Sequence, residues 1–342
     1  MVFEALRPGY ELMLPALALA FILDLLYPEH RGLLLKIHPV HTSYFMALRL
    51  GRPYSSKLRG VLIWVLVTLT HLAPYALALV IAYNASPLAW VIVASITLKF
   101  SFSLKLLVDI CYKAYKGFSK SLDEARRWTQ LIVRRDVSKL DEPRVVSATL
   151  ESLAESLVDG FTSPLLYYAL LGPLGALLQR VANTLDGALG FKTPEYREVG
   201  WFSAKMDTML NYIPARITAT LTITLAPLVD GSVKETWTTW RRWNRVTESL
   251  NAGHPMSAMA GALKVRLEKP GYYVINDNAR NPEPSDIARG LRIAITLSIL
   301  YLTLISVSIT VIQMLSIPLN GFLTHISSAS PGSSPPPLFQ FH

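Results

Sequence analysis

The sequence predicts an all-α, polytopic integral membrane protein with about 4–6 apolar helices and further helical segments in the aqueous phase. The 342 residues are 51% hydrophobic and only 17% charged, and the mean hydropathy is +0.33. This composition is too apolar for an ordinary soluble enzyme, and the apolar residues are gathered into blocks. Cys111 is the only cysteine, so neither an intrachain disulfide framework nor a thiolate metal site can form.

Six apolar runs are candidates for these helices. Residues 61–83 and 293–319 contain no Lys, Arg, Asp or Glu, and each is long enough to cross the hydrocarbon core alone. Four runs are weaker: the short run 12–26, the run 86–108 with Lys99 and Lys105, the run 161–179 with Pro164 and Pro173, and the run 210–229 with Arg216. Prolines and ionisable groups are tolerated in a span only where protein or a wet cavity satisfies them.

The distribution of positive charge predicts the orientation of a multi-pass protein of the cell membrane. Lys and Arg are concentrated in residues 29–59, 113–144 and 234–289, and they are absent from residues 84–87 and from the tail after residue 317. Because positive loops are retained in the cytoplasm, we predict cytoplasmic segments at residues 28–59, 113–160 and 230–290, with both termini on the other side. Residues 1–326 are predicted to form a single polytopic domain, and the Ser/Pro-rich residues 327–342 a disordered tail.

The first apolar run and the polar stretch 183–207 both bear on this topology. The first apolar run is predicted to be a retained helix, because Glu4 and Glu11 outweigh Arg7 and no cleavage pattern follows. The polar stretch 183–207 lies outside if runs 161–179 and 210–229 both cross the bilayer. It stays in the cytoplasm if either run dips in and returns, or packs within a cytosolic domain. The chemistry described below favours this second arrangement.

The net positive charge limits the classes of binding partner that the sequence favours. The 33 basic and 24 acidic residues leave a formal charge of +9, which suits nucleic acid, anionic lipid or phosphorylated ligands. The bases flank apolar blocks and do not form an aromatic-interleaved surface, so we predict a lipid bilayer as partner and no nucleic acid. A homo-oligomer is compatible with the sequence.

The densest group of candidate site residues runs from residue 151 to residue 216. Glu151, Glu155 and Asp159 are four residues apart, so on a helix they share one face and can hold a divalent cation. The alternative is a solvated helix face balanced by neighbouring bases. The polar residues that follow at helical spacings are Asn183, Asp186, Arg197, Lys205, Asp207, Asn211 and Arg216.

Arg216 and His254 each have two interpretations. An arginine in an apolar block needs an anion, so Arg216 either pairs with a protein carboxylate or awaits a phosphate or carboxylate ligand. Asn251 and His254 precede the small-residue run 258–262, where backbones or a flat ligand can approach closely. A lone histidine in such a place is more often structural than catalytic, and the same holds for His38.

Several nucleotide and hydrolase signatures are missing. Residues 187–193 read GALGFKT, which lacks the spacing of a phosphate-binding P-loop. No zinc-protease helix, GxSxG elbow or dinucleotide fingerprint is present either.

The order of motifs between residues 151 and 267 resembles the CobD/CbiB family of cobalamin biosynthesis. The matching elements are Glu151-Ser152, Ala154-Glu155, Asp159-Gly160, Ser163-Pro164-Leu165, Asn183-Thr184-Leu185-Asp186, Val199-Gly200-Trp201, Ala204-Lys205-Met206-Asp207, Asn211, Pro214-Ala215-Arg216, Asn251-Ala252-Gly253-His254-Pro255, Ala258-Met259-Ala260-Gly261-Ala262-Leu263 and Val265-Arg266-Leu267. The chain departs from the family pattern at Ser156-Leu157-Val158, at Thr208 and at Met256.

The resemblance implies an adenosylcobinamide-phosphate synthase. Such an enzyme is a ligase that joins the propionate of adenosylcobyric acid to aminopropanol phosphate, or a related amino alcohol, as an amide at the expense of ATP. It implies catalytic roles for Glu151, Glu155, Asp159, Asp186 and Asp207, with Mg²⁺ on Glu155 and Asp159. It further implies corrinoid and amino-alcohol phosphate as substrates, bound by Asn183, Arg197, Lys205, Asn211, Arg216, Asn251 and His254.

Two non-catalytic alternatives remain open at this point. A membrane transporter or corrinoid-handling scaffold would also keep buried charges such as Lys99 and Arg216. A regulatory member of the same superfamily would keep the helical frame without the chemistry.

Overall fold

The structure, a computed structural model, describes residues 2–328, with side chains described as far as residue 315. The helices of the first half are α1 (Val2–Leu6), α2 (Tyr10–Leu26), α3 (Gly32–Lys36), α4 (Pro39–Leu50), α5 (Lys57–Ala85), α6 (Pro87–Lys99), α7 (Leu104–Phe118), α8 (Leu122–Gln130) and α9 (Glu142–Leu157). The second half has the π-helical turn η1 (Val158–Thr162), α10 (Ser163–Leu189), α11 (Trp201–Leu210), α12 (Tyr212–Leu225), the 3-10 turn η2 (Ala226–Val229), α13 (Val233–Trp243), α14 (Gly253–Leu263) and α15 (Pro284–Ser328).

Strands are nearly absent from the described chain. β1 (Leu267–Lys269) pairs antiparallel with β2 (Tyr273–Ile275) in a two-stranded sheet. The prediction of an all-α polytopic membrane protein is therefore confirmed. Most of the predicted disordered tail, residues 329–342, lies outside the described residues.

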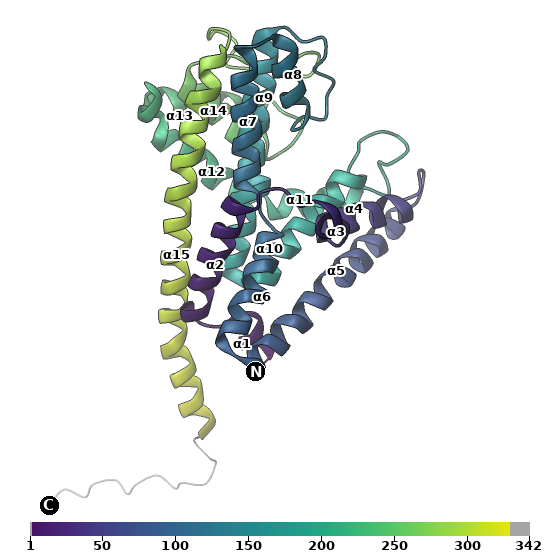
Figure 1. Ribbon diagram of the computed structural model, residues 1–342, viewed down its shortest axis with the longest axis vertical. Helices are drawn as coiled ribbons and strands as arrows, with labels where there is room; N and C mark the ends of the chain where they lie inside the picture. The colour runs from purple at the N-terminus through teal and green to yellow at the C-terminus, as the bar shows by residue number, and fades with distance from the viewer. Residues whose placement is uncertain (1, 329–342) are drawn as a thin grey trace, which may run out of the picture.

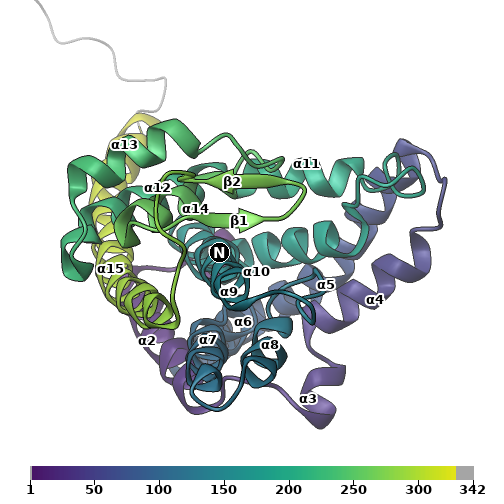
Figure 2. The same cartoon turned by 90° about the horizontal axis from the view of Figure 1, so that it is seen from above.

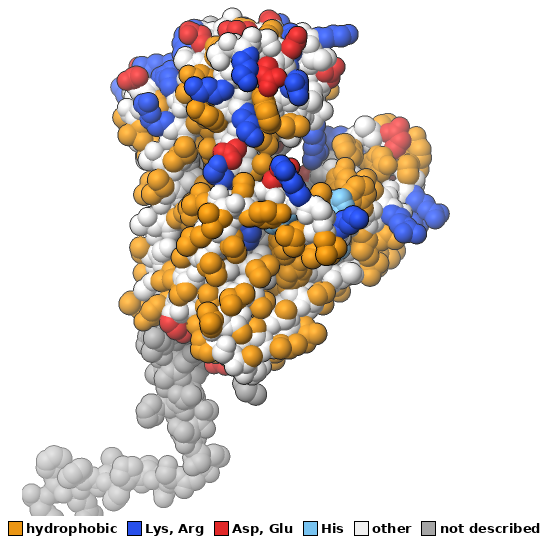
Figure 3. All heavy atoms as spheres, in the orientation of Figure 1, with side chains coloured by type: hydrophobic (Ala, Val, Ile, Leu, Met, Phe, Trp, Pro, Cys, Tyr) orange, Lys and Arg blue, Asp and Glu red, His pale blue; other side chains and the backbone are white. Residues whose placement is uncertain are grey.

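Six helical stretches are long and apolar enough to cross a membrane, at the upper limit of the predicted range. They are Val2–Leu26, Lys57–Ala85, Pro87–Phe118, Glu142–Leu189, Tyr212–Val229 and Pro284–Leu315. Large apolar side chains point outward along them, among them Leu69 and Ile81 on α5 and Ile299 on α15. Figure 3 shows such side chains covering the lower half of the molecule, whereas charged side chains gather at its top and at one side. An outward apolar surface of this extent is typical of contact with lipid.

Three parts of the molecule are distinguished in Figure 1. The apolar half consists of α1, α2, α6, much of α10 and the lower parts of α5 and α15. The head, at the top, consists of α7, α8, α9, α13, α14 and the two strands. The arm, on the right, consists of α3, α4, α11 and the first half of α5. Figure 2 shows from above that α10 extends from beside α9 toward α4 and α5 of the arm.

Local sequence explains the sharp turn between α5 and α6. The Ser86 hydroxyl accepts a hydrogen bond from the Ala89 backbone N–H, and Pro87 follows at the first helical position. A serine cap with proline behind it is a strong start signal for a helix. Because Ser86 also ends α5, α5 and α6 form an antiparallel pair with no loop residues to spare.

Helix α10 turns back on itself at Gly172. This residue has φ 73° and ψ −164°, a conformation that only glycine adopts readily, and Pro173 starts the second arm. The segments before and after this turn approach each other closely beside it, since a Cβ atom on Gly175 would collide with the Tyr167 carbonyl oxygen. Run 161–179 is therefore divided into two segments that meet at a sharp turn, which is compatible with the second of the two arrangements considered for it. The polar stretch 183–207 lies beside the arm, where Val199 packs on Gly60.

A buried ion pair explains how Lys99 is accommodated within the apolar run 86–108. Lys99 Nζ lies 2.7 Å from Asp24 Oδ1, and both side chains are almost fully buried. The second carboxylate oxygen of Asp24 accepts a hydrogen bond of 2.8 Å from the Lys105 backbone N–H. The charges in α2 and α6 thus satisfy each other inside the bundle.

Candidate functional site

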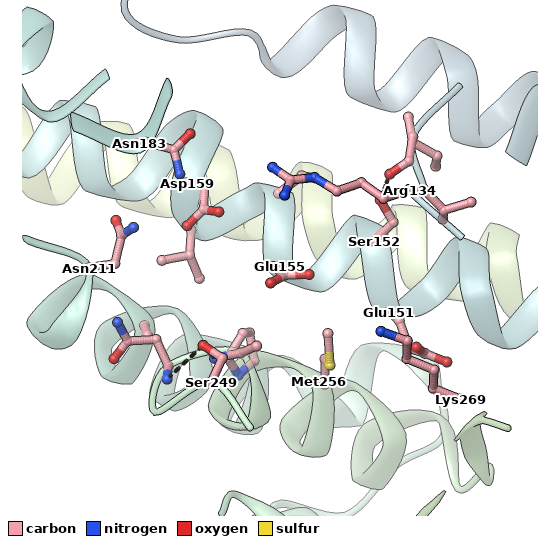
Figure 4. Close-up of a pocket in the computed structure, with 18 of the residues that line it drawn as sticks. Arg134, Glu151, Ser152, Glu155, Asp159, Asn183, Asn211, Ser249, Met256 and Lys269 are labelled. Carbon is pink, nitrogen blue, oxygen red and sulfur yellow. Dashed lines mark hydrogen bonds between the residues drawn. The ribbon is translucent and has the colours of Figure 1, made fainter. Parts of the chain in front are cut away.

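A polar cavity of about 460 Å³ lies where the head, the arm and α10 meet, and we call it the main cavity (Figure 4). It is bordered by α9, η1, the part of α10 after Gly172, α11, α14, both strands and the coil before α9. Its polar and charged lining residues are Arg134, Arg135, Glu151, Ser152, Glu155, Ser156, Asp159, Asn183, Asp186, Asp207, Asn211, Ser249, Asn251, Lys269 and Tyr273. Segments far apart in the chain therefore build one site.

Four carboxylates of the cavity have no cationic partner. Glu155, Asp159, Asp186 and Asp207 all line it, and none has a Lys, Arg or His nitrogen within 4.0 Å among the described residues. Glu155 and Asp159 both point into the cavity in Figure 4. Asp159 lies in η1, and such π-helical turns are frequent at functional sites. Four acids without cationic partners around one cavity repel one another, which indicates a role in binding or chemistry.

Asp207 is held by two amides. Asn183 Nδ2 and Asn211 Nδ2 donate to Asp207 Oδ1 at 3.0 and 2.8 Å, and Gln179 Nε2 donates to Asn211 Oδ1 at 3.0 Å. Burial raises the pKa of Asp207, and the two amide hydrogen bonds partly oppose that rise. No described group bonds Oδ2, so the carboxylate is oriented by one oxygen and offers the other to the cavity.

Glu151 differs from the other acids of the cavity because both of its carboxylate oxygens accept hydrogen bonds from protein side chains. It accepts hydrogen bonds from Arg135 Nη2 at 3.2 Å, from Ser147 Oγ at 2.6 Å and from Tyr273 Oη at 2.8 Å. The burial of the Tyr273 ring, together with the nearby Glu151 charge, raises the pKa of that phenol, so it stays a donor. Glu151 therefore ties the coil before α9 to strand β2 and shapes the cavity wall.

Two cations face the unpaired acids. In Figure 4 the Arg134 guanidinium reaches into the cavity toward Asp159, and Lys269 lies on the opposite wall near Glu151. Neither forms an ion pair within 4.0 Å among the described residues. A cavity that holds both unpaired acids and unpaired bases suits a ligand that brings a metal cation together with phosphate or carboxylate groups.

Eight of the twelve predicted site residues line the main cavity: Glu151, Glu155, Asp159, Asn183, Asp186, Asp207, Asn211 and Asn251. Arg197, Lys205, Arg216 and His254 do not. Arg197 is exposed and lies 3.6 Å from Glu198, and Lys205 is an exposed residue of α11.

Arg216 does not pair with a protein carboxylate among the described residues. Its guanidinium carbon lies 3.4 Å from the centre of the Tyr212 ring, and Nη1 donates to Asn251 Oδ1 at 3.1 Å. His254 packs between α13 and α14 and accepts a hydrogen bond of 3.2 Å from Trp240 Nε1. His38 caps α4 by accepting from the Val40 N–H at 3.2 Å. All three side chains have structural contacts.

Of the departures from the family pattern, Met256 and the residues beside Leu157 lie at the cavity. Ser156, Val158 and Met256 line it, and Met256 Sδ lies 3.7 Å from Tyr273 Oη. Leu157 is fully buried in the hydrophobic core. The Thr208 hydroxyl donates to the Ala204 carbonyl, so Thr208 faces its own helix.

The acids fit a divalent cation only in part. No group of three His, Cys, Asp or Glu side chains within the described chain is close enough to enclose a metal ion. Mg²⁺ in phosphate-transfer sites is held by one or two carboxylates together with substrate phosphates and water. Glu155 and Asp159, one helical turn apart, match that donor set, and Asp186 and Asp207 do not complete a preformed cage.

The residues that the sequence analysis missed come from the coil before α9 and from the strands. Arg134 and Arg135 were counted only as charges of a cytoplasmic loop, and Lys269 and Tyr273 carry no recognisable spacing relative to the acids. Gln179 was included in an apolar run. The adjacent pair Arg134-Arg135, ahead of a helix with acids on one face, was the available signal for a basic wall.

The fold and the cavity define an all-α membrane protein with a charged cavity above its apolar half. The chain belongs to the CobD/CbiB family, because residues 17–298 match the model of the CobD/Cbib protein family. A probable cobalamin biosynthesis protein CobD of Aeropyrum pernix is 50% identical over 307 residues, which cover 90% of this chain and 96% of that protein.

Two further relatives carry the same description. One from Methanothermobacter thermautotrophicus is 37% identical over 76% of this chain and 86% of its own length. One from Pyrococcus furiosus is 32% identical over 85% of this chain and 97% of its own length. No solved structure matches the chain.

Proposed function

We propose that this protein is a cobalamin biosynthesis ligase that forms an amide bond at the expense of ATP. It would join the propionate of adenosylcobyric acid to aminopropanol phosphate or a related amino alcohol. The observation that carries the proposal is the main cavity, where the unpaired acids Glu155, Asp159, Asp186 and Asp207 face Arg134 and Lys269. The family membership supports the pathway.

The cavity contains the groups that such a ligation requires. Glu155 and Asp159 would hold Mg²⁺, whose charge offsets that of the nucleotide phosphates. Arg134 and Lys269 would bind phosphate oxygens by charge-assisted hydrogen bonds, in the place first assigned to Arg197, Lys205 and Arg216. Asn251 would contribute a neutral hydrogen-bonding group on the α14 side.

The chemistry balances as two substitutions. A propionate oxygen attacks the terminal phosphorus of ATP and ADP leaves, which gives an acyl phosphate. The amine nitrogen then attacks the acyl carbon, the C–O bond to phosphate breaks, and the amine loses one proton. Asp207 Oδ2 would accept that proton, since burial raises the pKa of Asp207 and a base with a higher pKa is more effective.

The test measures ATP-dependent amide synthesis with purified protein, corrinoid acid and amino-alcohol phosphate. We expect Asp207→Asn to lower kcat by about 100-fold or more, because general-base catalysis contributes that much. Asp123→Asn is the matched control, because Asp123 is an exposed partner of Arg126 on α8, and it should keep full activity. Wild-type rates in the Asp207 variant, or transport of cobinamide into proteoliposomes without any ATP-dependent product, would refute the proposal.

We place the cavity on the cytoplasmic side of the cell membrane, with the bilayer around the apolar half. The support is the turn at Gly172, which returns residues 183–207 to the level of the arm and its basic residues. Labelling of an engineered cysteine at Ser138, an exposed residue of the coil before α9, should proceed in inverted vesicles and fail in right-side-out cells.

A further inference from the structure

A second cavity of about 440 Å³ lies beside the main one, and we call it the histidine cavity. Its lining includes His30, His38, His41, Lys99, Phe100 and Arg180, contributed by the segment from α2 to α4, by the α6–α7 junction and by α10. The His30 and His38 rings pack on Phe100, with centroids 5.3 and 4.7 Å away. None of the roles described above uses this cavity.

The charge of the histidine cavity resides on Arg180. Lys99 is neutralised by Asp24 at 2.7 Å. Burial lowers the pKa of His38 to about 3, and the nearby positive groups His30, Arg180 and Lys99 add to the effect. Burial also lowers the pKa of His30. Both imidazoles are therefore neutral at pH 7. Glu29, which also lines the cavity, is paired with Arg31 at 2.6 Å, so Arg180 is left as a cation without a carboxylate in direct contact.

The Arg180 guanidinium has one bonded and one free edge. Nη1 donates to the Asn183 Oδ1 atom at 3.3 Å and approaches the Asp159 carbonyl oxygen at 3.5 Å. Nε and Nη2 have no hydrogen-bond partner among the described residues, and Arg180 lines the histidine cavity. No carboxylate lies within 4.0 Å of this arginine in the described chain. A buried guanidinium with a free fork is complementary to a carboxylate.

We propose that the histidine cavity is a second ligand site, which takes a carboxylate-bearing ligand with the carboxylate on Nε and Nη2 of Arg180. The ring faces of His30, His38 and Phe100 contact the apolar body of that ligand. Arg180 bonds Asp159 and Asn183, which line the main cavity, so the carboxylate lies next to the acids. That the ligand is the acyl donor rests on the proposed function, whereas the carboxylate site itself does not.

The sizes of the two cavities agree with this division. Each cavity, about 460 and 440 Å³, suits one drug-sized ligand, so the histidine cavity would receive the propionate arm of a corrinoid acid while the macrocycle, which is larger than either cavity, stays outside. The nucleotide would occupy the main cavity, with its terminal phosphate near Arg134. The propionate would arrive from the histidine cavity and meet that phosphate beside Arg180.

The test is equilibrium binding to purified protein in detergent, without nucleotide or Mg²⁺. The probes are a corrinoid with one free propionate and the same corrinoid with that propionate as a primary amide. The wild type should bind the acid about 10-fold to 100-fold more tightly than the amide, as expected for a charge-assisted hydrogen bond. Arg180→Gln should bind both probes alike, and Arg242→Gln, at an exposed arginine of α13 outside both cavities, should keep the preference.

A second variant protects the test against misfolding of Arg180→Gln. Leu106 lines the histidine cavity, and Leu106→Trp should fill it and weaken both probes equally at an unchanged Tm. Equal affinities in the wild type, a preference that survives Arg180→Gln, or unaltered binding to Leu106→Trp would each overturn the proposal. If the wild type prefers the acid probe but synthesises no amide, the carboxylate site is supported and the proposed function is refuted.

Discussion

The charges inside this protein are treated in two different ways. In the bundle, Asp24 is bonded both to Lys99 and to the Lys105 N–H, and at the start of α15 Asp286 is bonded to Arg280 at 2.7 Å and to Arg289 at 2.8 Å. In the main cavity Glu155, Asp159, Asp186 and Asp207 have no such partners. Asp24 and Asp286 are fully buried and neutralised, whereas Asp159, Asp186 and Asp207 are half-buried, Glu155 is exposed to the open cavity, and none of these four is neutralised.

The difference separates charges that hold the fold from charges that are held ready for a ligand. A buried ion pair is strongly destabilising only when one partner is removed. Unpaired acids in a cavity repel one another in the folded state, so the fold gains nothing from them and keeps them at a cost. Substitutions in the two regions should therefore have opposite effects on stability and on activity.

The largest effect should come from an acid of the main cavity. Asp159→Asn should lower amide synthesis by about 100-fold or more, because a neutral amide cannot offset the charge of a bound cation. The Tm should stay the same or rise, since one of four repelling carboxylates is removed. Activity and thermal unfolding are measured on the same detergent preparation. A fall in Tm that accounts for the lost activity would erase the contrast between the two regions.

The buried pair should show the reverse pattern. Lys99→Met leaves Asp24 charged and unpaired, which should lower the free energy of unfolding by about 3–5 kcal/mol. The double variant Asp24→Asn with Lys99→Met removes both charges and keeps an acceptor for the Lys105 N–H, so it should recover most of that loss. Denaturant unfolding of the single and double variants checks this. Additive losses in the double variant would contradict a structural pair.

Glu151 lies in the main cavity but should behave like the bundle pair. Glu151→Gln weakens the contacts with Arg135, Ser147 and Tyr273, and we expect a loss of about 1–3 kcal/mol in unfolding free energy. Amide synthesis should fall less than in Asp159→Asn. Comparing kcat and Tm for the two variants shows whether Glu151 has a structural or a catalytic role. A catalytic defect as large as that of Asp159→Asn, at wild-type stability, would move Glu151 into the catalytic group.

The sequence was most informative where one periodicity carries the signal. Hydropathy located all six apolar helices, because a span needs a long apolar run, and the spacing of Glu155 and Asp159 placed both on one wall of the cavity. The motifs of the CobD/CbiB family marked Asn183, Asp207 and Asn211 as members of the same site.

The rest depended on contacts between distant segments. Pro173 indicated an interruption in run 161–179, but only the φ of Gly172 shows that the chain returns. Arg134 enters the site from a coil whose neighbours come from α10 and β1. Arg216 contacts the Tyr212 ring and the Asn251 amide and no protein carboxylate among the described residues, and these neighbours come from segments that the local sequence does not relate.

The smallest expected effect concerns His254, a structural group that should make stability depend on pH. Burial lowers the pKa of His254 from 6.5 to about 4, and the positive charges of Arg216 and Arg245 add to the effect. Below pH 6.5 the unfolded chain binds a proton that the folded imidazole excludes. The stabilisation present above pH 6.5 is therefore lost as the pH falls toward about 4.

His254→Gln tests this assignment, because a glutamine oxygen can still accept the Trp240 Nε1 hydrogen bond but does not titrate. We expect equal Tm values at pH 7.0 and a smaller loss of Tm at pH 5.0 for the variant than for the wild type. Some dependence should remain in the variant, since the pKa of His38 is lowered in the same way. Parallel Tm curves for the two proteins would show that folding does not lower the pKa of His254 and would contradict this assignment.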